Sequence, residues 1–130
     1  RGQHNVTVVG EPALALVDPV RFEQILSHLI QNAIEASPAD APVAITIDAD
    51  PARVTITVID RGCGMSAGFV RDELFRPFAS SKQGGFGIGA FEARQLAEAM
   101  HGIVMVETAP GAGTRFAVGF PAAQPMELAA

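Results

Sequence analysis

Residues 43–65 read VAITIDADPARVTITVIDRGCGM and contain two stretches in which apolar and polar residues alternate. These stretches, at 41–49 and 52–59, are separated by an Asp-Pro pair. Alternation with a period of two predicts half-buried strands, and a short turn between two such strands predicts an antiparallel hairpin. The second strand leads directly into an acidic residue, Asp60. The hairpin is therefore the centre of a predicted sheet, and it carries a carboxylate at one end.

Upstream of the hairpin, an apolar stripe predicts a helix. Apolar residues recur there at three- and four-residue spacing, namely Phe22, Ile25, Leu26, Leu29, Ile30, Ala33 and Ile34. Asp18 followed by Pro19 predicts the start of this helix, and Ser37 marks its end. Two short strands are predicted before it, at 5–9 and 13–17.

Downstream of the hairpin, residues 60–89 break the periodic pattern and predict a long irregular connection, which in a compact domain is usually functional. A second helix is predicted from about 88 to 100, closed by Gly102. Two last strands, at about 103–108 and 114–120, flank a glycine-rich turn. The predicted fold class is an α/β two-layer sandwich (α+β), in which helices cover one face of a mixed, mostly antiparallel sheet.

The composition fits one globular domain over 1–130, with a frayed tail at 122–130. Apolar residues make up 48% of the chain, charged residues 18%, and the net charge is -5, which argues against a nucleic-acid surface. The one cysteine, Cys63, fits a reducing compartment. The chain starts at Arg1 without an initiator Met, so we expect a fragment of a longer protein, with room for a membrane anchor upstream.

The first helix carries polar residues beside its apolar stripe. His28 and Asn32 are four residues apart and Glu35 follows three later, so the spacing predicts that all three project from one helical face. An asparagine on such a face offers an amide oxygen to a hard cation such as Mg²⁺. The sequence leaves the role of His28 open. The imidazole could accept a proton from water, it could only hydrogen-bond a metal-bound water or a phosphate, or it could be a packed helix histidine.

Asp60 is followed by a turn that contains Gly62 and Gly64. An ionised carboxylate only accepts hydrogen bonds, so it can take the exocyclic amino hydrogen of adenine and disfavour guanine at that edge. The two glycines permit a close approach of the backbone. The carboxylate at a strand end and the turn after it are therefore a candidate adenine site.

A second group of glycines, Gly85, Gly87 and Gly89, opens the second predicted helix. Closely spaced glycines let backbone N–H groups face a phosphate, and a helix N-terminus adds partial positive charge. A dinucleotide-binding fold would need these glycines directly after a strand. Here they follow a loop with the sequence LFRPFASSK (74–82), so that alternative is excluded by the order of the elements.

Taken in order, these motifs resemble the catalytic domains of sensor histidine kinases, within the GHKL superfamily (Bergerat fold) that also holds gyrase, large heat-shock chaperones and MutL. The resemblance covers about 18–121, and the stretches LFRPFASSK and GGFGIGAFEARQLAEAMHG are similar to the kinases of PEP-CTERM systems. The sequence departs from the common pattern at His28, where most histidine kinases carry Asn and gyrase-type ATPases carry a water-activating Glu.

The resemblance implies ATP and Mg²⁺ as ligands. Asn32 matches the Mg²⁺-binding residue, Asp60 matches the residue that reads adenine with an ordered water near Gly64, and Thr114 matches a residue that supports that Asp. The Phe residues of 74–82 are expected to anchor a lid over the nucleotide. The implied nucleotide-binding set is Asn32, Asp60, Gly62, Gly64, Met65, Phe78, Lys82, Gly85, Phe86, Gly87, Ile88, Gly89 and Thr114. His28 and Lys82 are the catalytic candidates, and Lys82 reads equally well as a solvated loop lysine.

Sensor histidine kinases transfer the γ-phosphoryl group of ATP to a histidine on a separate dimerisation domain. His4, His28 and His101 all lack a context suited to a phosphoacceptor, so we expect this domain to bind ATP with little turnover by itself. A response regulator downstream, a homodimeric full-length protein and a cytoplasmic domain with an inner-membrane anchor are further expectations. The alternatives are a gyrase- or MutL-like ATPase, an anti-sigma-type serine kinase, and a degenerate module that binds a partner without nucleotide.

Overall fold

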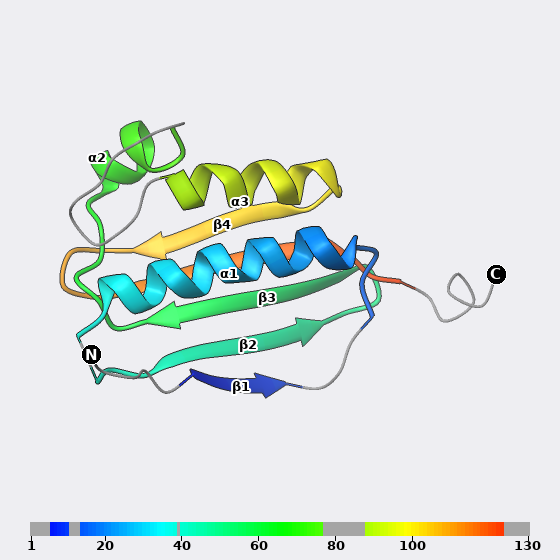
Figure 1. Cartoon of the computed structure of the whole chain (residues 1–130), viewed down its shortest axis with the longest axis horizontal. Coiled ribbons are helices and arrows are strands. Elements are labelled where there is room, and N and C mark those ends of the chain that lie inside the picture. Colours follow the sequence, from blue (N-terminus) through cyan, green and yellow to red (C-terminus); the bar gives the residue numbers. More distant parts are fainter. Residues whose placement is uncertain (1–5, 11–13, 39, 77–87, 124–130) are drawn as a thin grey trace.

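The computed structural model describes residues 6–10, 14–38, 40–76 and 88–123. It contains a five-stranded sheet in the order β1-β2-β3-β5-β4, in which β1 and β2 are parallel and the other neighbours are antiparallel. The elements in chain order are β1 (Val6–Gly10), α1 (Pro19–Ala36), β2 (Val43–Ala49), β3 (Arg53–Asp60), α2 (Ala67–Phe69), η1 (Val70–Leu74), α3 (Ile88–Ala99), β4 (Ile103–Thr108) and β5 (Thr114–Pro121). Helices α1 and α3 cover one face of the sheet (Figure 1), which confirms the predicted two-layer sandwich.

The core lies between this pair of helices and the sheet. Helix α1 buries Ile25, Leu29 and Ala33, which are spaced one turn apart, and it packs on β2 and β3. Helix α3 buries three alanines, Ala90, Ala93 and Ala97. Small side chains permit close packing, and α3 lies against both α1 and β4. No helix in the described part of the chain has the length and apolarity needed to span a bilayer.

The end of α3 is closed by a motif in which a non-glycine residue takes the left-handed conformation. Gly102 N–H donates to the Ala97 carbonyl at 2.8 Å and His101 N–H donates to the Glu98 carbonyl at 3.1 Å, which is the Schellman pattern. The residue with positive φ is His101, at 64°. Gly102 is needed for space, because a Cβ there would lie 2.8 Å from the Gly119 carbonyl oxygen.

Replacing His101 with glycine is expected to raise the free energy of unfolding by about 0.5–1 kcal/mol. The left-handed conformation costs an L-residue roughly 1–2 kcal/mol, and the greater freedom of glycine in the unfolded chain offsets part of that gain. Urea denaturation of the isolated domain followed by circular dichroism measures the change. A lower unfolding free energy would show that the exposed His101 side chain makes a contribution of its own.

The strand predicted at 13–17 is wrong for the described residues 14–17, which form one isolated bridge between Ala15 and Ala122. The segment pairs only with the end of β5, where the Leu16 N–H donates to the Pro121 carbonyl at 2.9 Å. The same bridge holds the first two residues of the tail that was predicted to fray at 122–130. Ala123 is buried and its N–H donates to the Leu14 carbonyl at 2.9 Å, while the rest of that tail lies outside the described residues.

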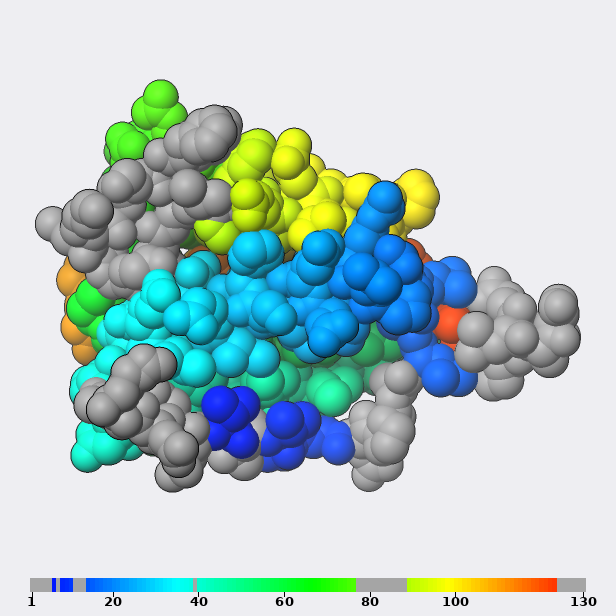
Figure 2. All heavy atoms as spheres, in the orientation of Figure 1, coloured from blue at the N-terminus to red at the C-terminus, as the bar shows by residue number. Residues whose placement is uncertain are grey.

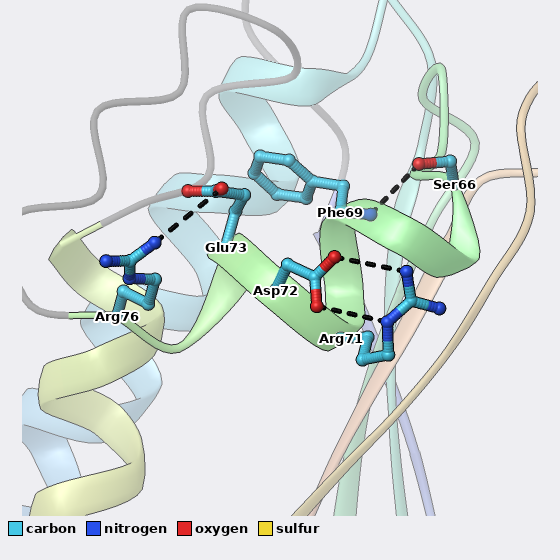
Figure 3. Close-up of polar contacts among 6 residues, drawn as sticks. All are labelled: Ser66, Phe69, Arg71, Asp72, Glu73 and Arg76. Carbon is cyan, nitrogen blue, oxygen red and sulfur yellow. Dashed lines mark hydrogen bonds and ion pairs between the residues drawn. The ribbon is translucent and has the colours of Figure 1, made fainter.

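The connection predicted to be irregular contains α2 and the π-helical turn η1. The Ser66 side chain caps this segment by accepting a hydrogen bond from the Phe69 N–H at 3.1 Å, and Leu74 ends it fully buried. The sequence pattern missed the segment because two turns are too short to show a helical period. Exposed ion pairs, which contribute little stability, join Arg71 to Asp72 and Glu73 to Arg76 (Figure 3).

Candidate functional site

Asp60, the last residue of β3, is a buried carboxylate with 4% of its surface exposed. It accepts a hydrogen bond from the Gly62 N–H at 2.8 Å and another from the backbone N–H of Thr114, its partner on β5. Burial raises the pKa of Asp60 above its ordinary value, and the two backbone hydrogen bonds oppose that rise. Because an ionised carboxylate has about four acceptor sites, these two donors leave capacity for a ligand.

The turn after Asp60 interlocks with the turn between β4 and β5. The Gly111 N–H donates to the Cys63 carbonyl at 2.6 Å. Gly64 has a φ of 72°, and a Cβ at that position would overlap the Ala109 carbonyl oxygen. A side chain at Gly62 would in the same way overlap the last carbonyl of α1. The glycines of this motif therefore let three backbone segments meet beside the Asp60 carboxylate.

Thr108, the last residue of β4, joins these turns through its hydroxyl group. It donates to the Gly113 carbonyl and accepts from the Met65 N–H, both at 2.9 Å, and it lies 2.9 Å from the Thr114 hydroxyl. Thr114 was expected to support Asp60. Its backbone N–H donates to the Asp60 carboxylate, and its side-chain hydroxyl forms a hydrogen bond with the Thr108 hydroxyl. The sequence reasoning missed Thr108, although its register position opposite Thr114 follows from the hairpin.

Asn32 lies on the face of α1 that points toward α3. It has 6% of its surface exposed, and its amide nitrogen has no hydrogen-bond partner among the described residues. A Cβ on Gly89, in the first turn of α3, would lie 3.2 Å from that nitrogen and 3.4 Å from the amide oxygen. Glu35, predicted to project from the same face as His28 and Asn32, is exposed and accepts a hydrogen bond from the Gln31 side chain at 2.8 Å.

His28 lies one helical turn before Asn32, at the half-exposed border between α1 and α3. Its Nε2 atom is 3.3 Å from an oxygen of Glu92 on α3. The other ring nitrogen, Nδ1, is 3.6 Å from the position of a Cβ on Gly89. The interpretation of His28 as a packed helix histidine therefore does not describe it, since 37% of the side chain is exposed and Glu92 is its partner.

The remaining predicted residues fall into two groups. Met65 is buried and lines a cavity of about 510 Å³ with Cys63, Gly64, Ser66, Phe69 and Pro110. Phe78, Lys82, Gly85, Phe86 and Gly87 lie outside the described residues, and Ile88 is described only as the first residue of the α3 backbone. Of the expected aromatic anchors, Phe75 is described, and the guanidinium carbon of Arg94 lies 4.4 Å from the centre of its ring.

The geometry thus places a buried carboxylate at one end of the site and an unpartnered amide beside a helix N-terminus at the other. Residues 17–124 match the family model described as histidine kinase-, DNA gyrase B-, and HSP90-like ATPase, and the chain belongs to this family. The chain is 38% identical over 106 residues to the C4-dicarboxylate transport sensor protein DctB of Rhizobium meliloti, a match that covers 80% of this chain and 17% of that protein.

Other relatives are sensor kinases as well. The sensor histidine kinase ZraS of Klebsiella oxytoca is 31% identical over 120 residues, covering 90% of this chain and 26% of ZraS. The fold matches the mycobacterial sensor histidine kinase MprB with a TM-score of 0.78 at 21% identity, covering 91% of this chain and 81% of that chain. The chain spans about a quarter or less of the length of the curated relatives named here.

Proposed function

We propose that this domain binds ATP with Mg²⁺ and presents the γ-phosphate to a histidine on a separate dimerisation domain of the same kinase. The observation that carries the proposal is the buried carboxylate of Asp60, held by two backbone N–H groups at the end of β3. A buried carboxylate with spare acceptor sites suits the exocyclic amino group of adenine. Membership in an ATPase family and similarity to sensor histidine kinases support the same function.

The residues present fit a Mg²⁺ ion at the other end of the site. The Asn32 amide is buried, and within the described part of the chain its nitrogen has no partner, which leaves it available to a ligand. In the proposed complex the Asn32 amide oxygen would hold the cation, and the amide nitrogen would be available to a phosphate oxygen. The ion would supply positive charge against the phosphates.

Replacing Asn32 with alanine is expected to weaken Mg-ATP binding about 10-fold or more, because one metal ligand and one charge-assisted hydrogen bond are lost. Calorimetric titrations with Mg-ATP, and with ATP in the presence of EDTA, separate the two contributions. In the wild-type domain Mg²⁺ is expected to increase the affinity for ATP, and the variant is expected to lose most of that increase. Gln31→Ala, one position away and exposed, is the matched control. Equal Mg-ATP affinity of wild type and Asn32→Ala would refute the metal site.

Phosphoryl transfer in this proposal depends on position and charge neutralisation rather than on covalent chemistry of the domain. The domain holds the nucleotide, and the acceptor histidine and its proton acceptor belong to the dimerisation domain. We further propose a homodimeric full-length kinase, a response regulator that receives the phosphoryl group, and a cytoplasmic position for this domain, with an inner-membrane anchor elsewhere in the full-length protein.

Incubation of the full-length protein with γ-labelled ATP tests this function directly. The expected product is a labelled protein whose phosphate is lost in acid and retained in alkali, as is characteristic of phosphohistidine. The isolated domain is expected to bind ATP with little turnover. Acid-stable labelling would favour a serine kinase, and phosphate release without labelling would favour a gyrase-like ATPase.

A further inference from the structure

A contact between the His28 ring and the Glu92 carboxylate connects the two helices beside the proposed phosphate end of the site. Helices α1 and α3 lie side by side on the covered face of the sheet (Figure 2). The contact joins the His28 Nε2 atom to a Glu92 oxygen at 3.3 Å, and both side chains are partly exposed. They also line a cavity of about 470 Å³ between the helices, together with Arg21, Gln24, Gln95, Leu96 and Ala99.

The identity of the partner decides which nitrogen of His28 carries the proton. In a neutral imidazole one ring nitrogen donates and the other accepts, and the hydrogen bond made by one nitrogen sets the state of the other. A carboxylate oxygen 3.3 Å from Nε2 carries negative charge and no proton to donate, so it favours the neutral tautomer with the proton on Nε2. The Nδ1 atom, close to Gly89, is then an acceptor.

The same glycine also contacts the proposed metal ligand. A Cβ at Gly89 would lie 3.6 Å from His28 Nδ1 and 3.2 Å from the Asn32 amide nitrogen. The acceptor nitrogen of His28 and the Asn32 amide therefore border the same small space at the N-terminus of α3. A Mg²⁺ ion bound with nucleotide keeps several waters, and these waters donate strong hydrogen bonds.

We propose that Glu92 is a positioning residue that holds the His28 ring so that Nδ1 accepts a hydrogen bond from a water on the Mg²⁺ ion of bound Mg-ATP. The inference rests on the proposed function of the site. Partners that orient the groups around a metal typically change metal affinity 10- to 100-fold. Because Glu92 acts through His28 and through the water on the metal, it contributes to ATP affinity when Mg²⁺ is present and not when Mg²⁺ is removed.

Calorimetry on the 130-residue domain tests this role with Glu92→Ala and the matched control Glu98→Ala, which removes an equally charged, exposed side chain from the same helix. Glu92→Ala is expected to weaken Mg-ATP binding about 10-fold, to leave ATP binding in EDTA unchanged, and to shift the His28 ring away from the Nε2-protonated tautomer in ¹⁵N NMR spectra. Glu98→Ala is expected to match the wild type in all three measurements.

A second variant distinguishes positioning from a structural role. In His28→Asn the side-chain amide oxygen replaces the Nδ1 acceptor without needing Glu92, so adding Glu92→Ala to it is expected to have no further effect on Mg-ATP affinity. The inference would be overturned if Glu92→Ala bound Mg-ATP as tightly as the wild type, or if it lost as much ATP affinity in EDTA as in Mg²⁺. Neither result would affect the proposed function. Failure of the wild-type domain to bind ATP would overturn the proposed function itself.

Discussion

The Asp60→Asn variant is expected to bind ATP about 10- to 100-fold more weakly than the wild-type domain at neutral pH. The estimate follows from the loss of a hydrogen bond between adenine and a charged acceptor, which is worth about 1.5–3 kcal/mol. An asparagine also presents an amide nitrogen, which is a donor where the amino group of adenine needs an acceptor. Calorimetric titration with ATP measures the loss, and titration with GTP measures whether the preference for adenine falls.

Two comparisons separate this effect from misfolding. Asp48→Asn, at an exposed position on β2, is expected to bind ATP like the wild type.

Burial raises the pKa of Asp60, so the contribution of this carboxyl group to stability is full at low pH and falls as the pH rises through the raised pKa. Asp60→Asn without ATP should therefore be at least as stable as the wild type at pH 7, with an advantage that shrinks toward pH 4. A variant that is less stable at pH 7 and binds ATP normally would contradict the assignment.

Gly113→Ala is expected to lower the free energy of unfolding by about 2–5 kcal/mol. Gly113 has a φ of 75°, which costs an L-residue about 1–2 kcal/mol, and a Cβ there would overlap the backbone carbonyl of Asp60. Relief of such an overlap moves backbone and costs about 1–3 kcal/mol more. Because the displaced carbonyl belongs to the proposed adenine-binding residue, ATP affinity is expected to fall together with stability in the folded population.

The same turn contains its own control. Gly111 has a φ of 78°, and a Cβ there would meet nothing within 4 Å. Gly111→Ala therefore carries the conformational cost of about 1–2 kcal/mol without the overlap. Chemical denaturation of both variants measures the difference, which isolates the contact with the Asp60 backbone. Equal destabilisation of the two variants would show that the turn moves freely away from β3.

Most of the fold could be predicted from the sequence because its elements are long and strongly periodic. The apolar stripe of α1 and the alternation in β2 and β3 locate three elements to within about two residues of their observed ends. The strand predicted at 13–17 failed because a short apolar run has the same composition as a strand, whereas the described residues 14–17 pair only at Ala15, with the residue that follows β5.

The sequence predicts which residues belong to the site, but it does not predict the surroundings of their side chains. Asp60 and Asn32 could be predicted from their motifs, but their burial, the pKa shift of Asp60 and the unpartnered amide of Asn32 depend on segments that pack from elsewhere. Contacts between distant residues left no local signal. The contact of His28 with Glu92 and the hydrogen bond from the Met65 N–H to the Thr108 hydroxyl are of this kind.

The dependence of Asp60 on the β4–β5 turn has a consequence for the order in which the site forms during synthesis. The ribosome releases Asp60 and its glycine turn well before Thr108 and Thr114, which supply the hydrogen bonds that hold this turn. A nascent chain that ends before β5 therefore lacks the framework of the adenine site. ATP can stabilise the domain only after this last hairpin has emerged and docked, so the ligand favours the completed chain over every shorter intermediate.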